Sequence, residues 1–419
     1  MGGILSILMP RPTSPTPPSE PHILICGGGV VGLALAQGCR EAGIPYTLFE
    51  RDDTSSSRAQ GWALTLHWCL DALERTIGPE RASKLETAVV DSSLGEDEGN
   101  FLFLNAATSK AKYRIPPSKR RLRLHRQKLR GILASGLNIE YGKSAESFMD
   151  LPDGRIKVSF SDGTSANGSL LVGADGNNSA IRSQLCKEAS LNKLPVNLIG
   201  VVRHFTPDQA KAVRAIDPLL FQALHPDTGN YLWFSIQECI PEPTGETSYN
   251  ALVIISWLIH DEAQDAIPST SRERIRLMKA RAEGFAEPLK SIVMDIPDDE
   301  PFTTPLRLGD YVPDVENKWD NLGGKVTLAG DAAHAMTMYR GEGANHGILD
   351  AALFVDAMKR VVNGEITQEE AVGAYEEEMC RRTKDAVLKS RRAALDAHVW
   401  EKVTDESPCI GARIPPATA

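Results

Sequence analysis

The sequence predicts an α/β fold, α+β overall, in which an α/β domain is interrupted by a sheet-rich domain and ends in a long helix. A short apolar run at 22–26 leads into a glycine-rich turn, a helical pattern and a second strand. The middle of the chain, 194–308, alternates strand-like runs and has no such glycine motif. Apolar positions at helical spacing then dominate 348–395.

The first element is a strand–turn–helix–strand unit at 22–50. Its glycine-rich turn, Gly27-Gly28-Gly29-Val30-Val31-Gly32, fits the pattern GxGxxG in the expected strand-to-helix context. Gly27 allows the tight turn, Gly29 lets the backbone approach a pyrophosphate, and Gly32 lets the helix lie close to the strand. The unit predicts a Rossmann-like dinucleotide site, and the alternative is a tight turn in an α/β protein that binds no nucleotide.

The second strand of this unit ends at Glu50, 18 residues past Gly32. A carboxylate at that place can accept hydrogen bonds from the hydroxyls of a ribose. The helix N-terminus before it offers unpaired N–H groups and the positive end of a dipole to phosphates. The acid and the glycines therefore support the same nucleotide site.

Two later apolar strands also end in an acid. The first continues as Gly173-Ala174-Asp175-Gly176 and the second as Gly330-Asp331-Ala332-Ala333-His334. After the second strand comes Gly341-Glu342-Gly343-Ala344-Asn345, and an apolar helical stretch follows it. A strand-end carboxylate that faces a second helix start can hold a polyol and place N–H groups beside an anion.

Composition narrows the function classes. The 419 residues suffice for two or three domains, and 46 basic against 55 acidic side chains argue against a nucleic-acid partner. Seven cysteines without paired metal-ligand spacing argue against a disulfide framework and a metal site, and favour reduced thiols in the cytoplasm. No apolar run is long enough for a transmembrane segment. The start at Met1-Gly2 fits a loose myristoylation pattern, with an unmodified tail as the alternative.

Taken together, the three motifs resemble the group A FAD-dependent monooxygenases, the para-hydroxybenzoate hydroxylase-like flavoprotein family, over about 22–400. The resemblance implies an enzyme with FAD as cofactor and NADPH or NADH as co-substrate. It would use O2 to hydroxylate or epoxidise a hydrophobic, aromatic or polyketide-like small molecule of secondary metabolism through a flavin C4a-hydroperoxide. Three alternatives remain open: an FAD-dependent Baeyer–Villiger oxygenase or dehydrogenase, an NAD-linked dehydrogenase, and a non-catalytic FAD- or ligand-binding protein.

The resemblance also implies site residues. Those expected to bind the cofactor are Gly27, Gly29, Gly32, Glu50, Arg51, Arg58, Ala63, Arg126, Asp175, Asp331, Gly343 and Ala344. For catalysis, Arg203 and Tyr231 lie on strands expected to face the flavin ring, although a packed edge position is the alternative for Tyr231. Where many relatives have Gln, this chain has Glu342, whose charge would disfavour a reduced anionic flavin unless Arg340 offsets it. No metal ion is expected.

The same resemblance divides the chain and describes its partners. We expect a monomer or homodimer whose partners are a small-molecule substrate and O2. The expected segments are a flexible tail at 1–21, the first half of the FAD-binding domain at 22–193, a substrate-binding β-sheet domain at 194–308, the second half of the FAD-binding domain with the C-terminal helices at 309–402, and a flexible tail at 403–419.

Overall fold

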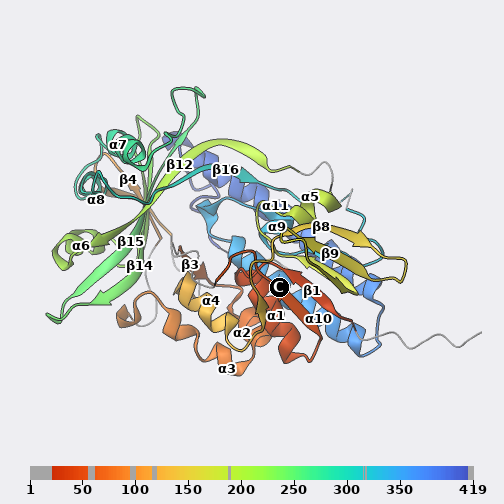
Figure 1. Ribbon diagram of the computed structural model, residues 1–419. Coiled ribbons are helices and arrows are strands. Elements are labelled where there is room, and N and C mark those ends of the chain that lie inside the picture. Colours follow the sequence, from red (N-terminus) through yellow and green to blue (C-terminus); the bar gives the residue numbers. More distant parts are fainter. Residues whose placement is uncertain are drawn as a thin grey trace, which may run out of the picture.

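The structure of the protein is a computed structural model that describes residues 21–54, 62–94, 101–115, 120–186, 190–314, 316 and 319–413. Figure 1 shows an α/β region on one side and a sheet-rich region, covered by helices, on the other. The expected tail at 1–21 and the myristoylation pattern at Gly2 fall almost entirely outside the described residues. Across the described chain, no helix combines the length and the apolar character needed to cross a bilayer.

A five-stranded parallel sheet organises the α/β region. Its strand order is β17 (Val326–Leu328), β11 (Leu170–Gly173), β1 (Ile23–Cys26), β2 (Tyr46–Phe49) and β7 (Ile139–Glu140). All four residues of β1 are buried, as expected for a parallel strand with both faces covered. The helices around it include α1 (Val30–Glu41), α2 (Leu70–Ile77), α4 (Arg126–Ala134) and α10 (Gly343–Val362), and α1 packs against all three others.

Smaller sheets complete this region. The antiparallel strands β8 (Ala145–Asp150), β9 (Ile156–Phe160) and β10 (Ser165–Gly168) form one of them, and β3 (Ala63–Leu66) pairs with β6 (Leu122–His125) in the other. The helix α5 (Ala180–Leu185) contacts β8, and α9 (Asp331–His334) directly follows β17. The chain therefore returns to the parallel sheet after the sheet-rich region, as an interrupted domain requires.

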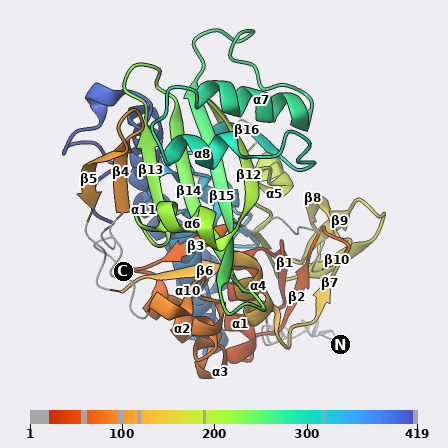
Figure 2. The ribbon, with the colours of Figure 1, turned by 90° about the vertical axis from the view of Figure 1, so that its left-hand side faces the viewer.

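A seven-stranded sheet forms the other region of the molecule. Its order is β16 (Thr304–Asp310), β12 (Asn192–Phe205), β15 (Thr247–Leu258), β14 (Tyr231–Pro241), β13 (Leu220–Leu224), β4 (Phe101–Asn105) and β5 (Lys110–Ile115). The helices α6 (Pro207–Arg214), α7 (Ser271–Arg281) and α8 (Leu289–Met294) lie over one face of it (Figure 2). Side chains alternate along β12: Val201 packs in the cluster under these helices, whereas Leu198 packs in the cluster on the opposite face.

Strands β4 and β5 differ from the expected division of the chain, because 101–115 belong to the large sheet although they lie within 22–193. Pairing explains the difference: β4 runs parallel to β13, with Leu102 opposite Phe221 and Leu104 opposite Ala223. Burial of these apolar side chains stabilises the long-range pairing. Strand β16 likewise extends past 308 to Asp310.

The expected flexible tail at 403–419, which follows the long helix α11 (Gln368–Asp396), is instead packed against the core in its described residues 403–413. Val403 and Cys409 are fully buried and pack, with Ile410, against the sheet face that carries Tyr231. The hydroxyl of Ser407 donates to Asp396 Oδ2 at 2.7 Å. Apolar side chains thus anchor a stretch whose Pro, Gly and Ser content alone suggested no structure.

Candidate cofactor and substrate site

A cavity of about 740 Å³ lies between the α/β region and the large sheet. Its walls include the N-terminal ends of α1 and α10, the carboxyl ends of β1 and β2, strand β3 and Trp233 of β14. A cavity of this size, with polar groups at one end and apolar side chains at the other, is typical of small-molecule sites.

The turn before α1 is built for close backbone contact. Gly27 has φ +118°, and a Cβ added there would lie 2.2 Å from the carbonyl oxygen of Ala174. A Cβ on Gly32 would lie 1.9 Å from the carbonyl oxygen of Gly27, so the helix could not approach the strand. A Cβ on Gly29, by contrast, would meet no protein atom within 4 Å, and Gly29 lines the cavity. This empty space, before a helix start that no side chain of the described residues caps, suits a pyrophosphate.

Glu50 lies at the end of β2, beside this turn. Its Oε2 accepts the backbone N–H of Gly28 at 2.8 Å, and its Oε1 accepts that of Asp52 at 3.0 Å. The side chain is buried and lines the cavity, with lone pairs left for further donors. Arg51, next along the chain, is exposed and lines the same end of the cavity. A ribose beside Glu50 fits this arrangement.

Two further carboxylates line the cavity. Asp175 Oδ2 accepts the backbone N–H of Ala180 at 2.9 Å, whereas its buried Oδ1 has no hydrogen-bond partner within the described chain. Burial raises the pKa of Asp175 and also that of Asp331, whose side chain opens to the cavity. Arg126, the first residue of α4, also lines the cavity, and its positive charge opposes the rise in the pKa of Asp331. An unpaired buried acceptor indicates room for a donor that the chain itself does not supply.

The start of α10 forms the second helix end at the cavity. Gly343 and Ala344 line the cavity, and no side chain of the described residues caps this end. Asn345 fixes its position: Nδ2 donates to the carbonyl of Thr65 at 3.0 Å, and Oδ1 accepts the N–H of His67 at 3.0 Å. Ala63, on the same strand as Thr65, also lines the cavity. Two uncapped helix ends therefore face one cavity.

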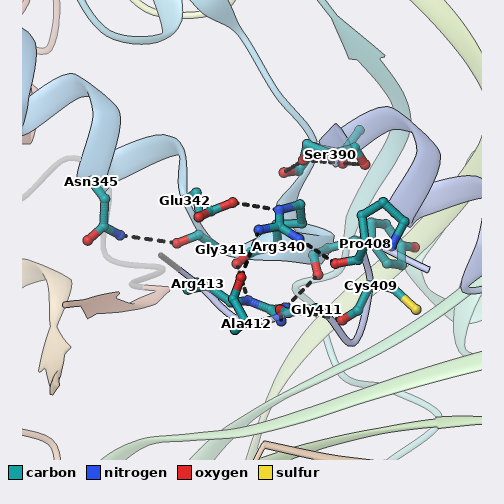
Figure 3. Close-up of polar contacts among 12 residues, drawn as sticks. Arg340, Gly341, Glu342, Asn345, Ser390, Pro408, Cys409, Gly411, Ala412 and Arg413 are labelled. Carbon is teal, nitrogen blue, oxygen red and sulfur yellow. Dashed lines mark hydrogen bonds and ion pairs between the residues drawn. The ribbon is translucent and has the colours of Figure 1, made fainter. Parts of the chain in front are cut away.

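Glu342 is paired, as Figure 3 shows. The Nε of Arg340 donates to Glu342 Oε2 at 2.5 Å, and both side chains are buried. Arg340 also donates through Nη1 to the carbonyl of Pro408 in the C-terminal segment. The positive charge of Arg340 thus offsets the carboxylate that the sequence places near the cofactor end.

A buried polar network behind Asp331 was not predicted. Asp350, on α10, accepts the N–H of Gly330 at 2.8 Å, a hydrogen bond from His334 Nε2 at 2.6 Å, and another from Arg382 Nη2 at 2.7 Å. The contacts give His334 a structural partner and hold the turn that presents Asp331 to the cavity. The one sign of this network in the sequence is the carboxylate of Asp350 inside an apolar helical stretch.

The structure does not bring Arg203 or Tyr231 to the cavity. Arg203 lies two residues after Val201, on the sheet face that α8 covers, and its Nη1 donates to the carbonyl of Ile292 at 2.9 Å. Tyr231 is fully buried on the other face, where its hydroxyl donates to Gln222 Oε1 at 2.8 Å and Tyr339 packs beside it. Because side chains alternate between the two faces of a strand, Arg203 lies on the same face as Val201, away from the cavity. Tyr231 is kept from the cavity by its packing with the C-terminal segment.

The other predicted residues fall into two groups. Gly32 lies behind the cavity wall and permits the helix–strand contact, and Arg58 lies outside the described residues. The remaining ten line the cavity together: Gly27, Gly29, Glu50, Arg51, Ala63, Arg126, Asp175, Asp331, Gly343 and Ala344.

Replacing Arg203 with Gln is expected to lower the free energy of unfolding by about 1–3 kcal/mol, because carbonyls at the end of α8 lose a charged donor. The affinity for FAD is expected to stay at the wild-type value, since the side chain lies outside the cavity. Urea unfolding and FAD titration measure the two quantities. A selective loss of FAD affinity with unchanged stability would contradict this placement.

Comparison with known proteins decides the family. The model of the FAD binding domain family matches residues 20–390. A protein of Arthroderma benhamiae named "Probable FAD-dependent monooxygenase" is 39% identical over 417 residues, covering 94% of this chain and 96% of its own length. The chain belongs to the FAD-dependent monooxygenase family.

Other members of the monooxygenase family agree. The FAD-dependent monooxygenase dbaB of Emericella nidulans is 46% identical over 353 residues, covering 81% of this chain and 86% of its own. A solved structure from Photorhabdus luminescens, named a "putative FAD containing monooxygenase", matches with a TM-score of 0.77 and 26% identity, covering 90% of this chain and 98% of that one. The predicted fold class and the resemblance are confirmed, and the chain is an oxidoreductase of this family.

Proposed function

We propose that this monooxygenase uses NAD(P)H and O2 to hydroxylate or epoxidise a hydrophobic aromatic or polyketide-like small molecule, with FAD bound along the cavity. The observation that carries the proposal is the meeting of two uncapped helix N-termini, those of α1 and α10, with strand-end carboxylates on one cavity wall. A pyrophosphate and the oxygen-bearing edge of a flavin are both favoured at the positive end of a helix dipole.

In this proposal, each part of the cofactor lies against a different group of residues. The pyrophosphate lies at Gly29, the adenosine ribose at Glu50, and the ribityl chain near Asp331, while the flavin ring lies against Gly343 and Ala344. Further contacts come from Arg51, Ala63, Arg126, Asp175 and, beyond the described residues, Arg58. When bound, FAD supplies the redox chemistry: it accepts electrons from the nicotinamide and activates O2.

The apolar end of the cavity supports the proposed substrate class. It is lined from the large sheet and its neighbours by Trp62, Phe101, Ile115, Leu220, Trp233, Leu252 and Met338. Such a surface binds a flat hydrophobic molecule and keeps water away from the reacting atoms. The proposal places the enzyme in the cytoplasm, which seven cysteines without a disulfide favour.

The proposal is tested by mixing the FAD-loaded protein with NADPH or NADH without oxygen and then adding 18O2 with a panel of aromatic compounds. We expect bleaching of the flavin absorbance by a nicotinamide, and a product that carries one labelled oxygen atom. A flavin that is reduced but yields unlabelled, dehydrogenated product would favour the FAD-dependent dehydrogenase instead. A purified protein that takes up no FAD would contradict the proposal as a whole.

A further inference from the structure

The C-terminal segment brings a cation to the substrate end of the cavity. After α11 the chain turns back, and Val403, Cys409 and Ile410 anchor it in the core beside the large sheet. Arg413, at the end of this segment, then lines the cavity with its neighbour Ala412. Neither residue belongs to a cofactor motif.

The bonds of Arg413 all go to backbone carbonyls within the described chain (Figure 3). Its Nε donates to the carbonyl of Arg340 at 3.2 Å, and its Nη2 donates to those of Cys409 at 3.2 Å and Tyr339 at 3.5 Å. Its Nη1 donates to the carbonyl of Gly411. These contacts fix the position of the guanidinium group but leave its charge without a carboxylate partner among the described residues.

The neighbouring Arg340 differs from Arg413 in its ion pairing. Arg340 is neutralised by Glu342, whereas Arg413 has no such ion pair in the described part of the chain. Burial, together with the charge of Arg340, lowers the pKa of Arg413 to about 10, so the side chain remains charged at neutral pH. A cation in a low-dielectric wall is costly unless an anion accompanies it.

An aromatic pair lies beside the guanidinium group of Arg413. The guanidinium carbon lies 5.1 Å from the ring centroid of Phe101, whose ring lies 5.6 Å from that of Trp233. Both rings line the cavity. A flat conjugated ligand that packs in the cavity against these rings would therefore place a substituent within reach of Arg413.

We propose that Arg413 binds and orients an anionic oxygen of the substrate, a phenolate, enolate or carboxylate on a conjugated ring system, against Phe101 and Trp233. The inference rests on the proposed function, because it assumes that the apolar end of the cavity holds the substrate. Four of the five N–H groups of Arg413 donate to backbone carbonyls, which leaves one N–H of Nη1 for a ligand. A charge-assisted hydrogen bond from this fixed guanidinium group gives an anion both affinity and orientation. Selectivity for an anion over its neutral isostere is the property that follows.

The experiment compares acids with their amides. FAD-loaded wild type, R413K, R413Q and the surface control R155Q are titrated with benzoate, 2-naphthoate and anthracene-2-carboxylate and with the matching amides, and flavin absorbance reports binding. We expect wild type and R155Q to bind at least one acid about tenfold or more tightly than its amide. R413Q should bind both equally, with the amide affinity kept, and R413K should retain part of the preference.

Three results would overturn the inference. Equal affinities for acid and amide in wild type across all three pairs would do so, as would a preference that survives in R413Q. An equal loss of both affinities in R413Q and R413K would assign Arg413 a purely structural role in holding the C-terminal segment. Failure of wild type to take up FAD would instead contradict the proposed function, so the two failures are distinguishable.

Discussion

Replacing Gly29 with Asp is expected to weaken FAD binding strongly while the fold stays intact. Gly29 has φ −74° and ψ 179°, which any residue adopts, and its Cβ would meet no protein atom. Aspartate is also a favourable N-cap and should stabilise α1 by about 1 kcal/mol. The same carboxylate would occupy the space of the pyrophosphate and repel its negative charge. The FAD affinity should therefore fall about 100-fold or more, which corresponds to about 2.7 kcal/mol.

Two measurements separate these effects: the thermal unfolding of the FAD-free protein and the quenching of FAD fluorescence on binding. Gly29→Ser is the matched control, because it adds a neutral cap of similar size and should cost less affinity than Asp. Gly32→Ala should instead destabilise the FAD-free protein, since its Cβ would clash with the carbonyl of Gly27. Wild-type FAD affinity in the Asp variant would place the pyrophosphate elsewhere.

The second large effect is expected from Asp350→Asn, which should lower the free energy of unfolding by about 3–5 kcal/mol, because Arg382 loses a buried charged partner. Although burial alone would raise the pKa of Asp350, the ring of His334 and the guanidinium of Arg382 hold it well below its usual value. This stabilisation is therefore present above about pH 4 and is lost only in strongly acidic solution. FAD affinity should fall as well, because Asp350 holds the turn before Asp331.

Asp356→Asn supplies the control on the same helix. Asp356 is half-exposed and pairs with Arg75 and Lys359 at the surface, so its replacement should cost less than about 1 kcal/mol. Urea unfolding of both variants from about pH 4 to pH 8 makes the comparison. Equal losses for Asp350 and Asp356 would show that the buried network does not hold this region together.

How much the sequence predicts depends on whether a signal is local. Gly27, Gly29 and Glu50 belong to one continuous strand–turn–helix–strand unit, so their meeting at the cavity followed from the motif alone. The prediction that Asp331 and Gly343 lie at the same cavity required one further assumption. It assumed that the strand end and the helix start that carry them lie at the same edge of the sheet. The family model, the curated relatives and the structural neighbours agree with the family resemblance and the fold class that these motifs predicted.

Long-range packing accounts for what the sequence does not predict. Nothing near Phe101 shows that its strand pairs with β13, because parallel pairing depends on a partner more than a hundred residues away. Arg203 was assigned the wrong sheet face by a pattern without a fixed motif, and its bonds to α8 show the actual one. Arg413 lies in a Pro- and Gly-containing segment whose order comes from the core it covers.

The placement of FAD along the cavity is tested most directly by a crystal structure of the FAD-loaded protein. We expect the pyrophosphate oxygens at hydrogen-bond distance, about 3 Å, from backbone N–H groups at the start of α1. The adenosine ribose should lie at Glu50 and the flavin ring against Gly343 and Ala344. FAD bound in the opposite orientation, or with its pyrophosphate away from Gly29, would contradict the placement.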